Sequence, residues 1–224
     1  MPARFTPLVT DNYYHVFNRG VNKRPIFNGV KDYKRLLNLL RFYNYADHPV
    51  RFSKFLLLSK DQRKEIWSRL ENSSTLLNII AYCFMPNHFH LLVKQNIENG
   101  TSRFLANIQI SYTKYFNIKN DRVGPLLQGQ FKAVKIDSEE QLLHVSRYIH
   151  LNPYSSALIK NIKDIADYEW TSFKEYLEDV DYPVCSHDLI NGYFTNKDKH
   201  KDFVLNDADY QKSLEYVKHL TIES

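Results

Sequence analysis

Residues 76–94 read LLNIIAYCFMPNHFHLLVK, and this stretch decides the fold. Its first part, 76–85, is strongly apolar and rich in residues that favour strands. Pro86-Asn87 interrupts the run, and residues 88–94 then alternate between polar and apolar side chains. We therefore expect two strands that form a hairpin at this dipeptide.

The flanking sequence adds strands and helices to this hairpin. Alternation predicts strands at 12–18 and 131–136, and apolar residues at helical spacing predict helices at 31–46 and 101–117. Ser138 and Gln141 form a possible capping box for a further helix, which is expected to end at Asn152 because Pro153 follows. The order β-α-β-β-α-β-α favours an α+β fold in which helices pack on an antiparallel sheet.

Two segments lie outside this pattern. Residues 47–75 look like an insertion, with a short helix expected at 61–72. After residue 160 the chain becomes acidic, and helices are expected around 171–179 and 207–219. We therefore predict one main domain over residues 1–160 and a mainly helical C-terminal extension over 161–224.

The charge is unevenly distributed. Residues 1–160 hold 23 Lys and Arg against 11 Asp and Glu, a net of +12, whereas residues 161–224 hold 7 against 14, a net of −7. The chain also has 16 Tyr and 14 Phe. Cations neutralise phosphates and aromatic faces stack on unpaired bases, so this composition suits a nucleic acid, particularly a single strand. The alternative is that the basic surface only keeps the protein soluble.

Other compartments and chemistries are disfavoured. No apolar run is long enough for a membrane span, and the first residues lack the apolar stretch of a signal peptide. Cys83 and Cys185 have no metal-site spacing, which disfavours zinc. We expect a reduced, cytoplasmic protein.

Two constellations are candidates for chemistry. In His88-Phe89-His90, both imidazoles of a strand point to one face and are able to reach one ion, although two surface or structural histidines would give the same pattern. His144, Tyr148 and Asn152 follow one stripe of the predicted helix. Taken alone, the pattern favours a packing role for Tyr148 over a catalytic one.

These residues resemble a known family. Residues 81–93, AYCFMPNHFHLLV, resemble the histidine–hydrophobic–histidine (HUH) motif of tyrosine transposases. Further segments match that family in the same order: 14–20 (YHVFNRG), 128–133 (QGQFKA), 147–153 (RYIHLNP) and 168–173 (YEWTSF). The chain is most similar to the REP-associated tyrosine transposases, relatives of the small insertion-sequence transposases. The resemblance implies the HUH endonuclease fold, which is ferredoxin-like.

The resemblance also implies an activity. A member of this family cleaves and joins single-stranded DNA at hairpin-associated sites, such as repetitive palindromic elements. By position, His88 and His90 would bind a divalent metal, Mg²⁺ or Mn²⁺, and Asn152 would complete its shell. Tyr148 would be the nucleophile that forms a 5′-phosphotyrosine intermediate. A free phenol has a pKa of ~10, so a metal or a basic neighbour such as His144 would assist it.

Several cations are candidates for DNA contact. Some follow the first strand, others lie on and after the second helix, and Lys132 and Lys135 are expected to share one face of the fourth strand. The candidates are Arg19, Lys23, Arg24, Lys114, Lys119, Arg122, Lys132 and Lys135. The family usually has Arg where Gln130 stands, which would weaken one phosphate contact. We expect a nucleoid-associated protein, with a monomer favoured and a dimer possible.

Two other functions remain open at this point. One is a non-catalytic, domesticated binder of repetitive palindromic DNA, against which the intact His, His and Tyr set argues. The other is an RNA-binding module, which would show no metal dependence and no covalent adduct.

Overall fold

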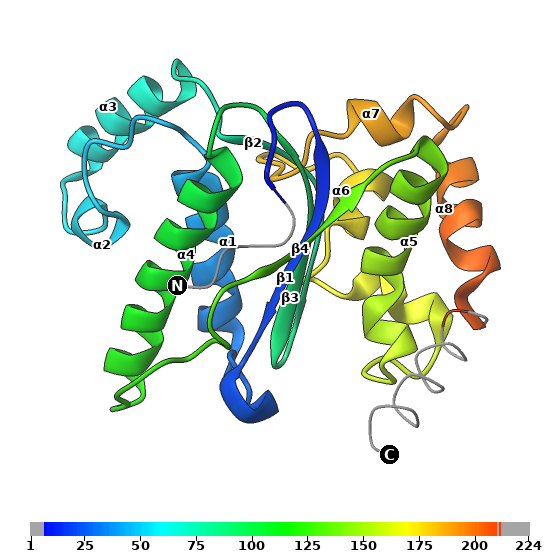
Figure 1. Cartoon of the computed structure of the whole chain (residues 1–224), viewed down its shortest axis with the longest axis horizontal. Helices are drawn as coiled ribbons and strands as arrows, with labels where there is room; N and C mark the ends of the chain where they lie inside the picture. Colours follow the sequence, from blue (N-terminus) through cyan, green and yellow to red (C-terminus); the bar gives the residue numbers. More distant parts are fainter. Residues whose placement is uncertain (1–6, 210, 212–224) are drawn as a thin grey trace.

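An antiparallel sheet between two layers of helices organises the chain (Figure 1). The computed structural model describes residues 7–209 and 211. In chain order the elements are β1 (Tyr13–Arg19), η1 (Val21–Lys23), α1 (Val30–Tyr43), α2 (Phe52–Phe55), α3 (Lys60–Glu71), β2 (Leu77–Met85), β3 (His88–Gln95), α4 (Gly100–Lys119), β4 (Lys132–Ile136), α5 (Glu139–Ser155), η2 (Ile162–Asp167), α6 (Phe173–Leu177), α7 (Asp188–Asn191) and α8 (Lys197–Asn206). The predicted α+β fold is confirmed.

The strands follow the order β2-β3-β1-β4. β2 and β3 form the predicted hairpin, with Pro86-Asn87 as its turn and Met85 opposite His88. β1 lies between β3 and β4, where Phe17 is opposite both His90 and Lys132. Residues that are opposite each other in an antiparallel pair point to the same face. This register therefore places the histidines of β3 on the same face as Phe17.

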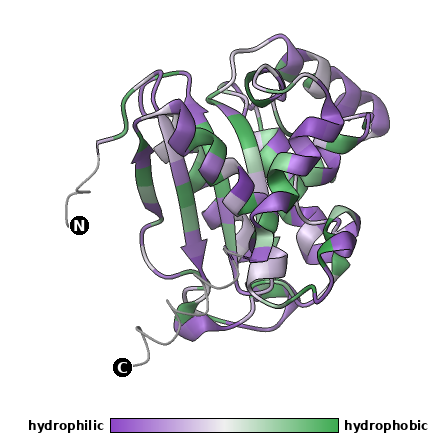
Figure 2. Ribbon diagram, turned by 90° about the vertical axis from the view of Figure 1, so that its right-hand side faces the viewer, coloured by the Kyte–Doolittle hydropathy of each residue, from purple (hydrophilic) through white to green (hydrophobic). Residues whose placement is uncertain are grey.

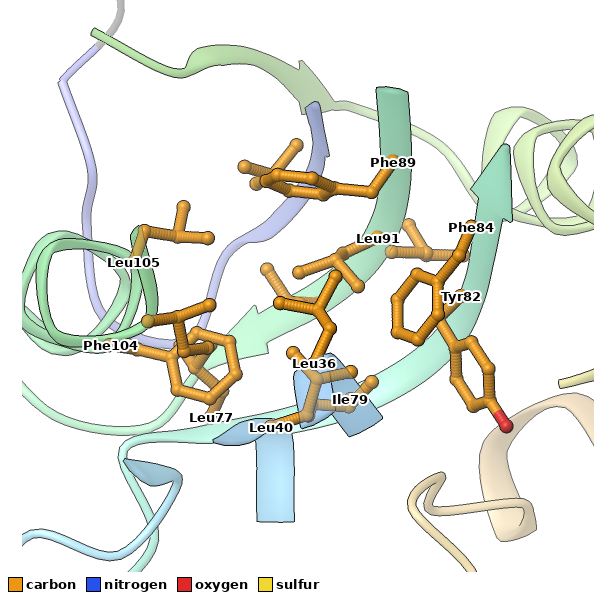
Figure 3. Packing of buried hydrophobic residues seen from close by; sticks show 14 of the residues in the cluster. Leu36, Leu40, Leu77, Ile79, Tyr82, Phe84, Phe89, Leu91, Phe104 and Leu105 are labelled. Atoms are coloured by element: carbon orange, nitrogen blue, oxygen red, sulfur yellow. The ribbon is translucent and has the colours of Figure 1, made fainter. Parts of the chain in front are cut away.

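The other face of the sheet packs on α1 and α4. Figure 3 shows side chains of β2, β3, α1 and α4 that interdigitate there, among them Leu36, Leu40, Phe89, Leu91, Phe104 and Leu105. All are buried, and burial of each such side chain contributes about 1.5–3 kcal/mol. Colouring by hydropathy shows apolar residues concentrated in the strands and in the helix faces toward them (Figure 2). This packing determines on which face of the sheet each strand side chain lies.

α5 covers the face that carries the histidines. Leu142 and Ile149 are buried against the main core. The prediction that Pro153 stops this helix at Asn152 is wrong, because α5 continues to Ser155 with Pro153 inside it. Proline costs a helix the hydrogen bond of its own N–H. Only two helical residues follow Pro153, and the Ser155 hydroxyl donates to the Leu151 carbonyl at 3.2 Å across the proline.

The segment after α5 covers the free edge of β2. Ser172 N donates to the Tyr82 carbonyl at 2.9 Å, and Tyr82 N donates to the Ser172 hydroxyl at 2.9 Å. Phe84 N donates to the Trp170 carbonyl at 2.8 Å, and Ser186 N donates to the Ile79 carbonyl at 2.8 Å. An uncovered edge strand would be open to pairing with another chain. These bonds remove that possibility on the β2 side.

The acidic C-terminal segment also packs against α5. Leu151 and Tyr154 of α5 form a small second core with Ile165, Phe173 and Val204. The helix predicted at 171–179 is present as the shorter α6. The helix predicted at 207–219 lies outside the described residues, apart from 207–209 and 211. None of the described helices combines the length and apolar character that a membrane crossing needs.

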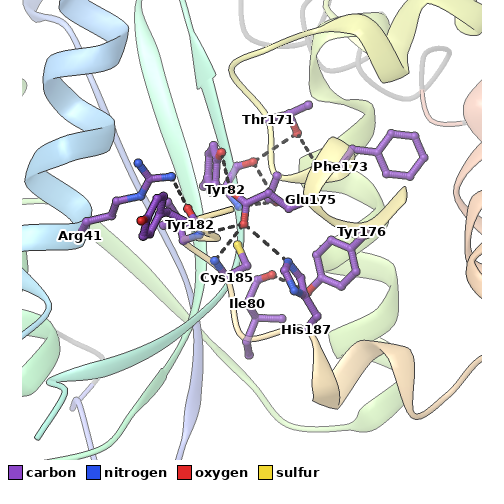
Figure 4. A network of polar contacts seen from close by, with 12 residues as sticks. Arg41, Ile80, Tyr82, Thr171, Phe173, Glu175, Tyr176, Tyr182, Cys185 and His187 are labelled. Atoms are coloured by element: carbon purple, nitrogen blue, oxygen red, sulfur yellow. Dashed lines mark hydrogen bonds and ion pairs between the residues drawn. The ribbon is translucent and has the colours of Figure 1, made fainter. Parts of the chain in front are cut away.

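A buried carboxylate, Glu175, ties this segment to the sheet (Figure 4). It accepts hydrogen bonds from the Tyr82 hydroxyl at 2.9 Å and from the backbone N–H groups of Val184 and Cys185 at 3.0 Å each. His187 Nε2 lies 3.5 Å from the same carboxylate. Burial alone would raise the pKa of Glu175, but the hydrogen bonds of His187, Cys185 N, Tyr82 and Val184 N together lower it.

We predict that Glu175→Gln lowers the free energy of unfolding by about 1–3 kcal/mol at pH 7, because buried donors lose a charged acceptor. Urea denaturation measures this loss, with the exposed Glu178→Gln as the matched control. The pKa of Glu175 lies below its ordinary 4.5, so wild type loses this stabilisation as the pH falls below about 4.5. Equal free energies of unfolding for the two variants would show that Glu175 does not stabilise the packing of this segment on the sheet.

Candidate active site

An open cleft of about 940 Å³ lies on the α5 side of the sheet. It is lined by residues of β1, the β2–β3 turn, the beginning of β3, the segment before β4 and the last turns of α5. His88, His90, Tyr148 and Asn152 all line it. Residues that lie up to 64 positions apart in the sequence therefore meet in one place, as their predicted roles require.

The two histidines of β3 form the floor of the site. Their ring centroids are 4.9 Å apart, with the planes at 85°. His90 is buried and His88 is half-buried. Phe17 of β1 lies beside them, with its ring centroid 5.7 Å from that of His90. The floor thus combines imidazole nitrogens with an aromatic face.

In both His88 and His90, the Nδ1 nitrogen lies within hydrogen-bond distance of a neighbouring side chain. His88 Nδ1 lies 2.6 Å from Asn87 Oδ1, which only accepts hydrogen bonds, so Nδ1 carries the proton. His90 Nδ1 lies 2.9 Å from His15 Nε2, and the two rings are stacked at 5.1 Å. When His90 donates in this pair, Nε2 of both His88 and His90 bears the lone pair. Metal-ligating histidines commonly have such a partner on the second nitrogen.

Tyr148 reaches the histidines from α5. Its ring meets the rings of His90 and His15 edge-to-face, with centroids 5.6 and 5.8 Å apart. Its side chain is half-buried, so the phenol borders the cleft. Gln211 Nε2 donates to the Tyr148 carbonyl at 3.1 Å, which ties this turn of α5 to the C-terminal segment.

Asn152 and His144 have different surroundings. Asn152 lies one turn after Tyr148, is 4% exposed and lines the cleft. His144 is exposed and does not line the cleft; its Nδ1 lies 2.6 Å from Arg147, and its Nε2 lies 3.6 Å from Glu140. The structure therefore brings Asn152, but not His144, to the cleft beside Tyr148.

The donor set fits a divalent cation of intermediate hardness. Two imidazoles and one amide oxygen converge on the cleft, a set that suits Mn²⁺ at least as well as Mg²⁺. Within residues 7–209 and 211, no group of three or more His, Cys, Asp or Glu side chains is placed to hold a metal. Among the described residues, a third protein ligand beside the two histidines would therefore be a neutral oxygen such as that of Asn152.

The predicted DNA-contacting cations fall into four groups. Arg19, Lys23 and Lys132 line the cleft, whereas Arg24 and Arg122 line a smaller hollow beside it. Lys114 is exposed on α4, on the opposite side of the sheet from α5 (Figure 1). The remaining two, Lys119 and Lys135, are ion-paired with aspartates.

These two ion pairs change the interpretation of the lysines. Lys119 Nζ lies 2.5 Å from Asp32 Oδ1, whose side chain is fully buried, so this lysine compensates a buried charge. The prediction that Lys132 and Lys135 share a face is wrong. Residues three apart on a strand point to opposite faces, and Lys135 is opposite Tyr14, whereas Lys132 is opposite Phe17. Lys135 pairs instead with Asp137 at 2.8 Å.

Sequence reasoning missed His15 and the role of Asn87. The alternation of β1 places His15 and Phe17 on one face, and this signal was available. Which face of β3 they would join depends on the register of β1 against β3, which the local sequence does not contain. Asn87 served only as a turn residue in the sequence analysis.

Comparison with known proteins supports the resemblance. Residues 54–152 match the family model described as "Transposase IS200 like". A solved structure described as "Structure of the REP associates tyrosine transposase bound to a REP hairpin" superposes with a TM-score of 0.57 at 15% identity, over 83% of this chain and 91% of that chain. No protein of curated function matches. The fold is that of a REP-associated tyrosine transposase, and the predicted resemblance to this family is confirmed.

We predict that His15→Phe lowers the population of the Nδ1–H tautomer of His90, because it removes the acceptor and keeps a ring in place. Two-bond ¹H–¹⁵N spectra of the histidine rings measure this population. His88 is the internal control, since Asn87 holds its Nδ1 independently. An unchanged His90 tautomer in the variant would contradict the pairing.

Proposed function

We propose that this protein is a metal-dependent endonuclease and strand transferase that acts on single-stranded DNA at hairpin-associated sites. The family match supports a transposase-type role in DNA processing at the coarse level. The observation that carries the finer proposal is the meeting of His88, His90, Tyr148 and Asn152 in one open cleft. A binder that never cuts DNA has no need of this set.

The chemistry proposed for Tyr148 is nucleophilic. The phenol gives up its proton as its oxygen attacks phosphorus, the bond from phosphorus to the 3′ oxygen breaks, and the leaving 3′ oxygen takes up a proton, so the number of protons is unchanged. The products are a 5′-phosphotyrosine and a free 3′-OH. Attack of another 3′-OH on the phosphotyrosine rejoins the strands and releases the phenol. The phosphodiester energy is retained in the protein–DNA bond, so no ATP is required.

The remaining residues of the cleft bind and orient. His88, His90 and Asn152 would hold a divalent cation. When bound, this cation would neutralise the negative charge that develops on the scissile phosphate. His15 and Asn87 position the imidazoles. Families of this HUH type use a divalent metal, which agrees with this donor set.

The cations of the cleft suit a DNA backbone. Arg19 and Lys132 flank the floor from β1 and β4, and Lys132 Nζ lies 6.0 Å from the centre of the Phe17 ring. A cation next to an aromatic ring that borders the cleft is an arrangement suited to holding a phosphate and stacking the neighbouring base. Among solved structures, the transposase similar to this chain is described as bound to a REP hairpin.

The organisation of the chain is part of the proposal. Residues 1–160 form the catalytic domain, 47–75 are an insertion in it, and 161–224 are an acidic extension. The described part of this extension packs on α5 and on the β2 edge, which favours a monomer with a site completed in one chain. We place its action in the cytoplasm, at the nucleoid.

We predict that Tyr148→Phe abolishes cleavage and leaves hairpin affinity nearly unchanged, because only the hydroxyl is lost. Purified protein, Mn²⁺ and a pool of single-stranded hairpin oligonucleotides are run on a denaturing gel. Wild type gives a slow-migrating protein–DNA adduct, which disappears in the variant and with chelator. Tyr182→Phe, at a 72% exposed tyrosine, is the matched control and retains the adduct. Normal cleavage by Tyr148→Phe would exclude Tyr148 as nucleophile.

We predict that His88→Ala weakens Mn²⁺ binding by about 100-fold or more, and that cleavage falls with it. Isothermal titration calorimetry measures the binding without reference to activity. His144→Ala is the matched control, because His144 lies outside the cleft and keeps wild-type affinity. If His144→Ala lost cleavage while Mn²⁺ binding stayed normal, the assisting role predicted for His144 would be restored.

A further inference from the structure

Three cations line the cleft, and one of them lies next to a proposed metal ligand. The lining includes Arg19, Lys23 and Lys132 but, among the described residues, no carboxylate. In the sheet, Arg19 of β1 is directly opposite His88 of β3, whereas Lys132 is on β4, on the far side of β1. Neighbouring strands lie about 4.8 Å apart, so Arg19 is one strand spacing from β3 and Lys132 is two.

Arg19 shares a face of the sheet with the histidines. Residues opposite each other in an antiparallel pair point to the same side, so the Arg19 side chain starts beside that of His88. His15, Phe17 and Arg19 alternate along β1 and form a row on this face. A strand rises about 3.3 Å per residue, so this row extends over about 13 Å, with His15 at one end and Arg19 at the other.

Tyr148 approaches this row from the His15 end. Its ring contacts the rings of His15 and His90, with centroids 5.8 and 5.6 Å apart. In phosphoryl transfer the attacking and leaving oxygens are roughly in line with phosphorus. A phosphate that lies over the histidines and is attacked from the Tyr148 side therefore has its leaving oxygen on the side of Arg19.

Hydrogen bonds hold the backbone around Arg19 in place. Arg19 N donates to Asn18 Oδ1 at 2.8 Å, and Gln128 N donates to the Arg19 carbonyl at 2.8 Å. The next residue, Gly20, donates its N–H to the Asn87 carbonyl, also at 2.8 Å. A donor whose position is fixed before the substrate binds needs little reorganisation when charge develops on the substrate.

The guanidinium has a donor that the protein does not use. Arg19 Nε is buried, and none of the described residues accepts a hydrogen bond from it. A guanidinium stays positively charged and has five N–H donors in one plane. A buried donor without an acceptor is costly, so this position favours an oxygen of the substrate as its partner.

We propose that Arg19 is a catalytic residue that donates a hydrogen bond to the leaving 3′ oxygen and neutralises the charge on it. This role rests on the proposed function. As the phenolic oxygen of Tyr148 bonds to phosphorus, the electron pair of the breaking bond stays on the 3′ oxygen. The guanidinium keeps its protons. The 3′ oxygen takes a proton from water, and the proton that the phenol has given up neutralises the resulting hydroxide.

Sulfur in place of the leaving oxygen tests this role. The phosphodiester that wild type cuts is first mapped from the DNA in the Tyr148 adduct. A hairpin oligonucleotide is then made with sulfur instead of the 3′ oxygen at that bond. A thiol has a pKa of ~8.5, far below that of an alcohol, so a thiolate leaves without a neutralising group. Rates of adduct formation are measured for both DNAs in single turnover, with Mn²⁺ and saturating protein.

Arg19→Ala is expected to form the adduct about 100-fold more slowly than wild type on the oxygen DNA, because one donor to the transition state is lost. On the sulfur DNA the variant is expected to stay within about threefold of wild type. Because both DNAs are compared in one variant, partial misfolding would lower both rates equally. Arg19→Lys keeps the charge and is expected to show a smaller difference between the two DNAs.

Lys132→Ala is the matched control, because it removes a cation of the same cleft that lies one strand further from β3. It is expected to change both rates by the same factor. An equal loss for Arg19→Ala on the two DNAs, or a wild-type rate of this variant on the oxygen DNA, would overturn the role of Arg19. When wild type forms the Tyr148 adduct, either result leaves the proposed function intact. When wild type forms no adduct with either DNA, the proposed function falls, and the role of Arg19 with it.

Discussion

The register of β1 against β3 is the constraint on which the rest of the structure depends. In this register Phe17 is opposite His90, and Val16 is opposite Leu91. Val16 and Leu91 are buried, on the face that packs on α1 and α4. A slip by one residue would exchange the two faces and expose this apolar set. The packing that stabilises the sheet therefore also fixes the rings of His15 and His90 against each other.

The position of the tyrosine depends on a second constraint, the packing of α5 from two sides. Ile149 joins the main core beneath the helix, and Leu151 joins the small core formed with α8. Arg147 adds an ion pair to Asp207 and lies over the Phe203 ring at 4.6 Å. The part of α5 that carries Tyr148 is thus packed against the sheet on one side and against the C-terminal segment on the other. The acidic extension is part of what positions the side chain that we propose as nucleophile.

Local patterns were sufficient to predict much of the fold, whereas the roles of His88, His90, Tyr148 and Asn152 were predicted only from the resemblance to a known family. Strand alternation and helical spacing are properties of short segments, and the hairpin, α1, α4 and α5 follow from them. The wrong or missing predictions concern features that are determined by contacts between residues far apart in the sequence. Pro153 is accommodated because the helix is almost complete at that point, and His15 joins the site only through strand pairing. The cover over the β2 edge by residues such as Ser172 has no local signal either.

Net charge likewise does not show which cations remain available to DNA. Lys119 neutralises the buried Asp32. Burial alone would raise the pKa of this carboxyl, but its hydrogen bonds, the strongest of them from Lys119, lower the pKa below its ordinary value. Lys94 and Lys135 pair with exposed aspartates, bonds that are weak and screened by salt. Arg19 and Lys23 instead line the cleft, on a segment tied to the turn before His88. The same short segment therefore bears the proposed phosphate contacts and is hydrogen-bonded to the turn that precedes His88. In the proposed function this connection would link DNA binding to the alignment of the histidines.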